Sequence, residues 1–108
     1  MNRKSVSLSA TDTLRVALTR GNALLVQLEG TGFTGTVDFK SSVDGSTWTN
    51  HPYVEQHTTS PSRSVAQLSN PTGPTTYLLS APVLHARIDV SVSAGSIKVV
   101  YREVLLEN

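Results

Sequence analysis

Apolar and polar residues alternate along most of this chain with a period of two, and no stretch shows the three-to-four-residue period of a helix. The pattern is clearest in residues 84–93 (LHARIDVSVS), where every second residue is apolar. Such alternation places one set of side chains on the core face of a strand and the other in solvent. Residues 13–19, 22–29, 36–43, 47–54, 63–69, 76–80 and 96–106 are predicted to be further strands. The spacing predicts an all-β fold, an antiparallel β-sandwich of about eight strands with jelly-roll or immunoglobulin-like topology.

Two short segments are predicted to be hairpin turns because they combine Gly with residues that tolerate a tight turn. Arg20-Gly21-Asn22 should join residues 13–19 to residues 22–29 as one hairpin. Ala94-Gly95 should join the last two strands as another.

Asp44-Gly45 is the strongest short-range hairpin signal in the chain. It lies within residues 35–49 (GTVDFKSSVDGSTWT), which read as a strand, a turn and a return strand that begins near Trp48. Residues 30–35 (GTGFTG) are expected to form a loop or bulge between strands. Their G-x-G lacks the following helix and the third glycine of a nucleotide-binding loop.

Composition agrees with one β-rich domain that spans residues 1–108. Only 38% of the residues are hydrophobic and 16% are charged, whereas 14 Ser and 13 Thr make up a quarter of the chain. Thr suits strands because its branched Cβ packs on a pleated surface, and Ser favours turns. The chain has no cysteine, so disulfides and thiolate metal sites are excluded.

Charge and hydropathy argue against nucleic-acid and membrane partners. The net charge is +1, and no basic stripe of the kind that binds nucleic acid is present. No apolar run approaches the ~20 residues of a membrane-spanning helix. The N-terminal residues lack the apolar core of a secretory signal, so we expect synthesis in a cytoplasm. We also expect residues 1–10 to form an extended N-terminal arm.

The residue types that usually perform catalysis or bind metals are present without a useful spacing. No two carboxylates are placed by sequence to share an acid–base site. His51, His57 and His85 do not show metal-ligand spacing, and no Ser lies in a nucleophile elbow. The sequence therefore predicts no enzyme, no catalytic residue, no metal and no cofactor.

The last predicted strand departs from strict alternation, because Val99-Val100 and Leu105-Leu106 place apolar residues on both faces. Either this strand is buried on both sides, or its end contacts another chain. The N-terminal arm is either a second contact or a disordered terminus. The candidate partner contacts at the two ends are Arg3, Lys4, Val6, Leu8, Val104, Leu105 and Leu106.

Three aromatic residues are candidates for exposed rings that could stack on a sugar. Phe33 and Tyr53 lie near predicted connections, and Trp48 follows the Asp44-Gly45 turn. A lone Trp beside a hairpin can equally be a packing anchor, so its exposure would separate the two roles.

The block that begins at Phe33 resembles small phage virion proteins. Its pattern is F-x-G-T-V-x-F-x-x-S-x-D-G-x-T-W over residues 33–48, followed by A-R-I-D-V at residues 86–90 and G-S-I-x-V at residues 95–99. The resemblance implies a β-sandwich module of the virion, made in the host cytoplasm, with no catalytic residues.

The resemblance implies a capsid decoration (cement) protein that binds the major capsid protein and stabilises the assembled head. A homo-oligomer, a dimer or trimer, is the expected form. The alternative is a glycan- or receptor-binding module of a phage tail or fibre, for which Phe33, Trp48 and Tyr53 would have to be exposed.

Overall fold

The computed structural model describes residues 3–19, 21–55, 63–80 and 84–105, and among them every regular element is a β-strand. The strands are β1 (Arg3–Leu8), β2 (Asp12–Ala17), β3 (Ala23–Ser42), β4 (Thr49–Asn50), β5 (Tyr53–Glu55), β6 (Arg63–Ser64), β7 (Leu68–Ser69), β8 (Thr75–Leu79) and β9 (His85–Val104). All pairings between them are antiparallel. The all-β antiparallel prediction is confirmed. Within the described part of the chain, no helix exists that could cross a membrane.

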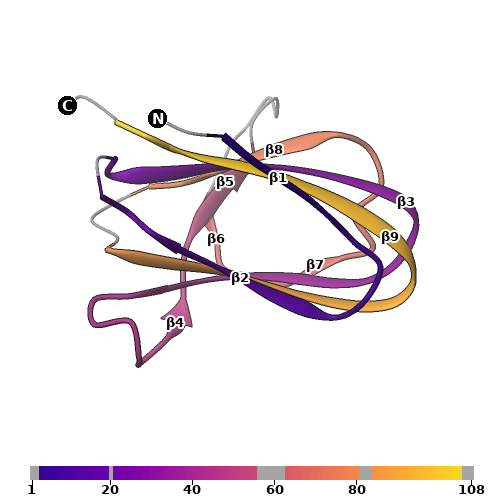
Figure 1. The fold of residues 1–108 in the computed structure, drawn as a ribbon, viewed down its shortest axis with the longest axis horizontal. Helices are drawn as coiled ribbons and strands as arrows, with labels where there is room; N and C mark the ends of the chain where they lie inside the picture. The colour runs from indigo at the N-terminus through magenta and orange to yellow at the C-terminus, as the bar shows by residue number, and fades with distance from the viewer. Residues whose placement is uncertain (1–2, 20, 56–62, 81–83, 106–108) are drawn as a thin grey trace.

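Two strands of 20 residues each, β3 and β9, form the centre of the structure. They pair with each other from Ala23↔Val104 to Ser42↔His85. Figure 1 shows both strands turning back together at one side of the molecule, so that each contributes to two facing layers. The described strands therefore form one continuous sheet bent over on itself, and they do not separate into the two independently paired sheets expected of a sandwich.

The shorter strands extend the two halves of this bent sheet. In the first layer, β1 pairs with the C-terminal half of β9, and β8, β5 and β6 follow in order beyond β3. In the second layer, β2 pairs with the N-terminal half of β9, while β4 and β7 pair with β3. Figure 1 shows the first layer above the second.

The bend lies where the sequence has its closest concentration of glycines. The β3–β9 register shifts between Thr31 and Thr34 and again between Thr34 and Gly35, as in a β-bulge. Across from it, Gly95 adopts φ 72°, a left-handed conformation that glycine reaches without steric cost. A Cβ at Gly95 would lie 2.1 Å from the carbonyl oxygen of Gly32, so the backbones approach too closely for a side chain.

Some backbone groups at the bend do not pair within the β3–β9 ladder and form hydrogen bonds with other residues instead. The Gly35 N–H donates to the side-chain oxygen of Asn70 at 2.9 Å, and the Asn70 N–H donates to the Gly35 carbonyl at 2.9 Å. The N–H of Val92 donates to the Thr11 hydroxyl at 3.0 Å. These bonds satisfy polar groups that a bulge would otherwise leave unpaired.

Both glycine-rich segments at the bend depart from the sequence-based expectation. Residues 94–95 do not close a hairpin, because β9 continues through them and both of its halves pair with β3. Residues 30–35 lie inside β3 instead of between strands, although the register shifts there fit the expected bulge. Glycine-rich segments predict chain reversals, whereas here they bend two strands that stay paired on both sides of a bulge.

The predicted hairpin between residues 13–19 and 22–29 is also absent. The register places Leu14 opposite Ile88 and Arg15 opposite Arg87, so β2 pairs with β9. The predicted N-terminal arm is likewise part of the sheet, because Arg3–Leu8 forms β1 along the edge of β9. Each segment completes the edge of a long strand and does not pair with its chain neighbour.

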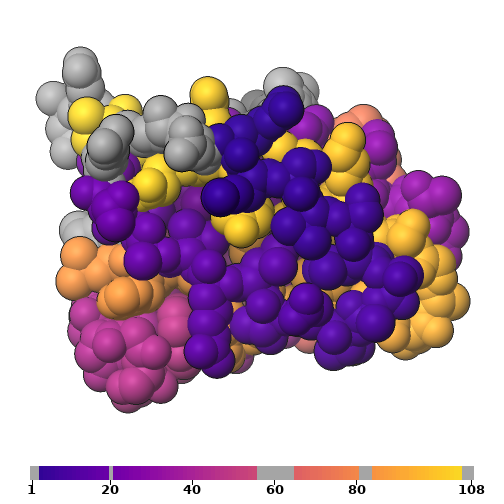
Figure 2. Space-filling model, viewed as in Figure 1, coloured from indigo at the N-terminus to yellow at the C-terminus, as the bar shows by residue number. Residues whose placement is uncertain are grey.

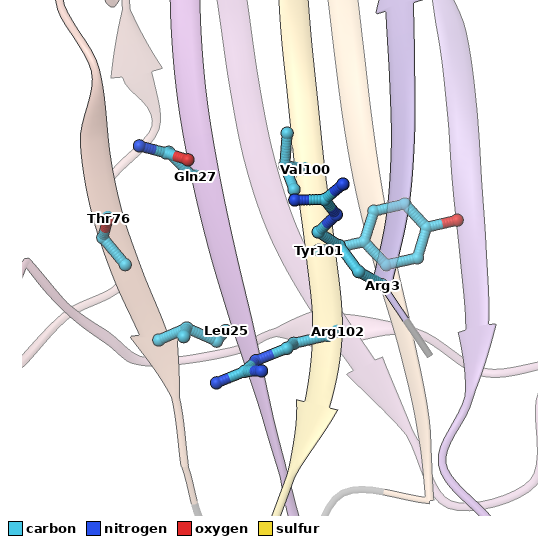
Figure 3. A pocket seen from close by; sticks show the side chains of 7 residues that line it. All are labelled: Arg3, Leu25, Gln27, Thr76, Val100, Tyr101 and Arg102. Carbon is cyan, nitrogen blue, oxygen red and sulfur yellow. The ribbon is translucent and has the colours of Figure 1, made fainter. Parts of the chain in front are cut away.

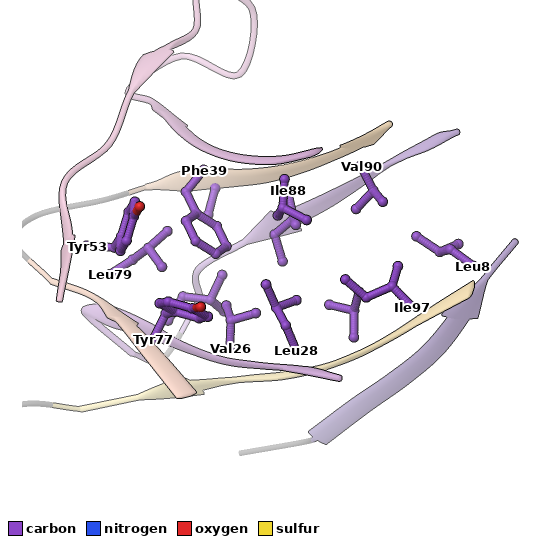
Figure 4. Packing of buried hydrophobic residues seen from close by; sticks show 14 of the residues in the cluster. Leu8, Val26, Leu28, Phe39, Tyr53, Tyr77, Leu79, Ile88, Val90 and Ile97 are labelled. Carbon is purple, nitrogen blue, oxygen red and sulfur yellow. The ribbon is translucent and has the colours of Figure 1, made fainter. Parts of the chain in front are cut away.

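The core lies between the two layers and consists mainly of the inward-facing aliphatic residues of β3 and β9 (Figure 4). The largest fully buried side chains are Leu24, Leu28, Leu79, Ile88, Ile97, Val26, Val37, Val90 and Val99. Each such side chain contributes about 1.5–3 kcal/mol when it is removed from water. The alternation predicted on β3 and β9 is therefore the alternation that builds the core.

Three rings close the core at the end opposite the bend. Phe39, Tyr53 and Tyr77 lie with ring centroids 5.1–5.8 Å apart, and two of the three pairs are edge-on. Such pairs add about 0.5–1.5 kcal/mol beyond their burial. Burial raises the pKa of the Tyr77 hydroxyl, with the Glu55 carboxylate as a further cause.

Replacing Gly95 with alanine should destabilise the fold, because the new Cβ would meet the Gly32 carbonyl in a left-handed backbone. We expect a loss of at least about 2 kcal/mol in the free energy of unfolding. Urea denaturation followed by tryptophan fluorescence measures it. Gly73→Ala is the matched control, since a Cβ at that position would meet nothing within 4 Å, and it should change stability by less than about 0.5 kcal/mol. Equal effects at the two sites would contradict this account of the bend.

Candidate partner-binding surface

The pairing of β1 with β9 brings the two candidate contact segments together, although they are almost a whole chain apart in sequence. Arg3 lies opposite Arg102, and Lys4 lies opposite Tyr101. Val104 ends β9, and Leu105 beyond it is 59% exposed. Figure 2 shows β1, in indigo, beside the yellow C-terminal part of β9 on one face of the molecule. Leu106 lies outside the described residues.

Two of the predicted contacts belong to the core instead. Leu8 is 7% exposed and sits opposite Ile97, and Val6 is partly buried opposite Val99. Because residues of a strand alternate between its faces, the apolar residues of β1 point inward. The expectation that Val6 and Leu8 are free for a partner is therefore wrong, whereas Arg3 and Lys4 are exposed.

The outer face of the first layer carries a groove of about 240 Å³ beside this paired end (Figure 3). Its lining residues come from β1, β3, β8 and β9: Arg3, Leu25, Gln27, Thr76, Val100, Tyr101 and Arg102. A second hollow of about 230 Å³ shares Gln27 and Val100 with the first and continues toward Glu29 and Lys98. The two hollows form one continuous surface, which we call the outer groove.

The outer groove shows where the two apolar faces of the last strand lie. Val99 is fully buried in the core, while Val100 faces outward and lines the groove. The same holds on β3, where Leu24 is buried and Leu25 lines the groove. The Val99-Val100 pair is evident from the sequence, but the other lining residues Leu25, Gln27, Thr76 and Arg102 were missed. Adjacent apolar residues on both faces of 22–29 and 96–106 were the available signal.

Positive charge dominates one end of the outer groove. Arg3 and Arg102 lie directly opposite each other on neighbouring strands. Like charges in this arrangement are destabilising. Among the described residues, no carboxylate forms an ion pair with either guanidinium. At the other end, Glu29 and Lys98 lie opposite each other, so their charges offset.

The outer face of the second layer has a different character, because it carries an ion pair between Arg87 and Asp89, with Arg15 and Lys40 opposite Arg87 on the neighbouring strands. The Arg87 Nε lies 2.9 Å from Asp89 Oδ1, and Arg87 Nη2 donates to Asp89 Oδ2 at 3.1 Å. The Arg87 guanidinium also lies 4.8 Å from the centre of the Trp48 ring. Trp48 is therefore a half-buried packing partner of an ion pair, and its cation–π contact contributes about 0.5–1 kcal/mol.

The other two candidate aromatics are not displayed. Phe33 is 4% exposed, because its ring packs into the core at the bend of β3. Tyr53 is 7% exposed within the ring cluster, and its hydroxyl donates to the Ala66 carbonyl at 2.8 Å. The prediction that Phe33 and Tyr53 are exposed is wrong. The sequence pattern places both residues near connections, whereas the structure has them in strands, with their rings in the core.

The buried histidine links the two layers at the open end of the sheet. His51 is 7% exposed, with Nδ1 2.9 Å from the Ser41 hydroxyl and Nε2 2.7 Å from the Ser80 carbonyl. Because a carbonyl only accepts hydrogen bonds, Nε2 carries a proton. Together the two contacts of His51 link the end of β3 to the residue that follows β8. His85 packs near Gly45, and His57 lies outside the described residues. No three His, Asp or Glu side chains of the described residues are grouped to hold a metal ion.

The Asp44-Gly45 turn is held by side-chain bonds, as its sequence predicts. Asp44 Oδ1 accepts from the N–H groups of Thr47 at 3.0 Å and Ser46 at 2.8 Å, and from the Ser42 hydroxyl at 2.8 Å. Gly45 takes the positive φ of 81°. Hydrogen bonds from the N–H of Thr47, then Ser46, and from Ser42 hold the pKa of Asp44 well below its ordinary value. The return strand is short, since only Thr49 and Asn50 pair with β3.

Comparison of the sequence with protein-family models and with curated proteins finds no match. Comparison with solved structures finds the fold in the crystal structure of SPBc2 prophage-derived protein YomS. The TM-score is 0.69, and the match covers 94% of this chain and 93% of that chain at 10% sequence identity. At this identity the likeness shows a shared fold over nearly the whole length of both chains.

Acid should destabilise the protein partly through Asp44. Because folding lowers the pKa of this carboxyl, its contribution to stability is complete above about pH 4, the ordinary aspartate value, and declines as the pH falls below it. Asp44→Asn keeps an accepting oxygen but removes the titrating group. The loss of stability between pH 6 and pH 3, measured by urea denaturation, should be smaller in this variant than in the wild type. An unchanged loss would show that the turn does not contribute to the acid response.

Proposed function

We propose that this chain is a structural protein of a phage particle, and specifically a capsid decoration protein that binds assembled major capsid protein and stabilises the head. It would act without catalysis, metal or cofactor, as a dimer or trimer in the virion. The observation that carries the proposal is the paired end of β1 and β9, where Arg3 lines an open groove and Lys4 and Leu105 are exposed at the same end of the two strands. A fold shared with a prophage-derived protein supports the phage assignment.

The rigidity of the sheet also supports a structural role. The outer groove lies mainly on strands β3, β8 and β9, whose opposite faces form the core, so its lining residues are held in place by packing. A protein bound in many copies to a regular lattice needs a fixed surface more than a reactive residue, because repeated weak contacts add up. The contacts of His51 with Ser41 and Ser80 fit this role, since they link the end of β3 to the residue that follows β8.

The alternative, a glycan-binding module of a tail or fibre, has less support. It requires three exposed aromatic rings, and the structure buries Phe33 and Tyr53 in the core. Trp48 is half-buried against Arg87, which covers part of its ring. No cluster of exposed rings is left among these candidates to stack on a sugar.

Binding to heads tests the proposal directly. Purified protein mixed with phage heads assembled without it should co-sediment with them and raise their melting temperature in a calorimeter. Protein that stays in the supernatant and leaves the melting temperature unchanged would contradict the proposal.

Leu105→Ser tests whether the paired end makes the contact. Removing an exposed aliphatic side chain from an interface should weaken head binding roughly three- to tenfold. Val65→Ser is the matched control, because Val65 is exposed to a similar extent, 54% against 59%, and lies away from this end on the segment between β6 and β7. Equal weakening by both variants would remove Leu105 from the interface.

A further inference from the structure

We propose that the outer groove binds an extended, acidic segment of a partner protein, with a carboxylate held between Arg3 and Arg102. The inference rests on the proposed docking function and names the chemistry of the partner. It begins from two features that coincide in one place: positive charge that no described carboxylate offsets, and an open apolar floor on the solvent side of the sheet.

The floor of the groove suits an extended peptide. Leu25 and Val100 supply its apolar part, and both are only partly exposed in their present setting. Gln27 and Thr76 stand beside them on neighbouring strands and offer side-chain hydrogen bonds to a peptide backbone. An extended segment presents every second side chain to one face, which lets apolar residues contact the floor at regular intervals.

An apolar row continues across the sheet from the cationic end. Arg102 lies opposite Leu25, Leu25 opposite Leu78, and Leu78 opposite Val54. Neighbouring positions in this row are separated by one strand-to-strand step of about 4.8 Å. Arg102 and Leu25 of this row line the outer groove, and Leu78 and Val54 extend the apolar surface beside it.

The two arginines make the cationic end suitable for a carboxylate. Their positions face each other across the β1–β9 pair, and neither is neutralised by a described carboxylate. In Figure 3 the Arg3 guanidinium lies beside Val100, and the Arg102 side chain extends toward Leu25. Guanidinium groups bind carboxylates through paired, charge-assisted hydrogen bonds. A partner carboxylate would also relieve the repulsion between the two like charges.

A peptide fits this surface better than a nucleic acid does. Phosphates recur along a strand and need cations along its length, whereas here the two arginines lie at one end and Glu29 lies opposite Lys98, the cation at the other end. Tyr101 packs its ring against the core, so it is not a free stacking platform for a base.

A peptide titration of the intact protein tests the inference. The probe is a synthetic peptide in which glutamate alternates with valine, added at millimolar concentration to ¹⁵N-labelled protein. Amide shifts should concentrate at Gln27, Thr76 and Val100. The same peptide with lysine in place of glutamate should give no such shifts, and rising salt should weaken the binding.

Two double variants distinguish specific binding in the outer groove from general attraction between the peptide and the positive charges of the protein. Arg3→Gln with Arg102→Gln should lower the affinity for the glutamate peptide by at least about tenfold, the expected effect of losing charge-assisted hydrogen bonds. Arg15→Gln with Lys40→Gln is the matched control, because it removes two exposed or partly exposed cations from the second layer. This control should leave the affinity for the glutamate peptide within about twofold of the wild-type value.

Three results would overturn the inference: no shifts in the groove, equal losses in both double variants, or tighter binding of a duplex DNA of similar charge. Failure of the proposed function looks different. If wild-type protein does not bind heads but the peptide binds as expected, the outer groove is a binding site for acidic peptides and the proposed capsid function is wrong. If heads bind both double variants as well as wild type, the capsid assignment stands and the groove is not the contact.

Discussion

The structure depends on the pairing of two long strands, which continues on both sides of a bulged bend. β3 and β9 share a ladder from one end of the molecule to the other, and every other described strand except β5 and β6 pairs directly with one of them. A flat ladder of this length would leave both of its faces in water. Bending it brings the apolar face of one half against the apolar face of the other, so the core forms within a single sheet. Glycine at the bend is required because the two backbones come too close for a Cβ.

The bend also determines which surfaces are available for function. It turns one face of each layer inward and leaves the opposite face to solvent, where the outer groove and the Arg87–Asp89 pair lie on different layers. The two outer faces therefore differ in chemistry. One has an ion pair beside Trp48, and the other has arginines without a described carboxylate partner beside an apolar floor. A partner that distinguishes these faces would approach this protein in one orientation.

Polar residues in this protein mainly hold strand ends in place. Asn70 binds the bulge, Asp44 and Ser42 bind the hairpin turn, and His51 joins the ends of β3 and β8. A sequence rich in hydroxyls and poor in charge supplies many such groups at low electrostatic cost. Trp48, His51 and Asp44, which first suggest chemistry in the sequence, contribute to packing and backbone geometry in the structure.

By itself the sequence determined most of the strands, the Asp44 turn and the core faces of residues 22–29, 36–43 and 84–93. These follow from local rules, since alternation and turn chemistry act over a few residues. Only the tertiary structure decided which strands pair, because pairing depends on the total burial reached by distant segments. The role of a glycine cannot be predicted from its neighbours in sequence either, since Gly95 permits a bend within a strand or a chain reversal equally well. The outer groove also could not be predicted from the sequence, because Arg3 and Arg102 become neighbours only when β1 pairs with the C-terminal half of β9.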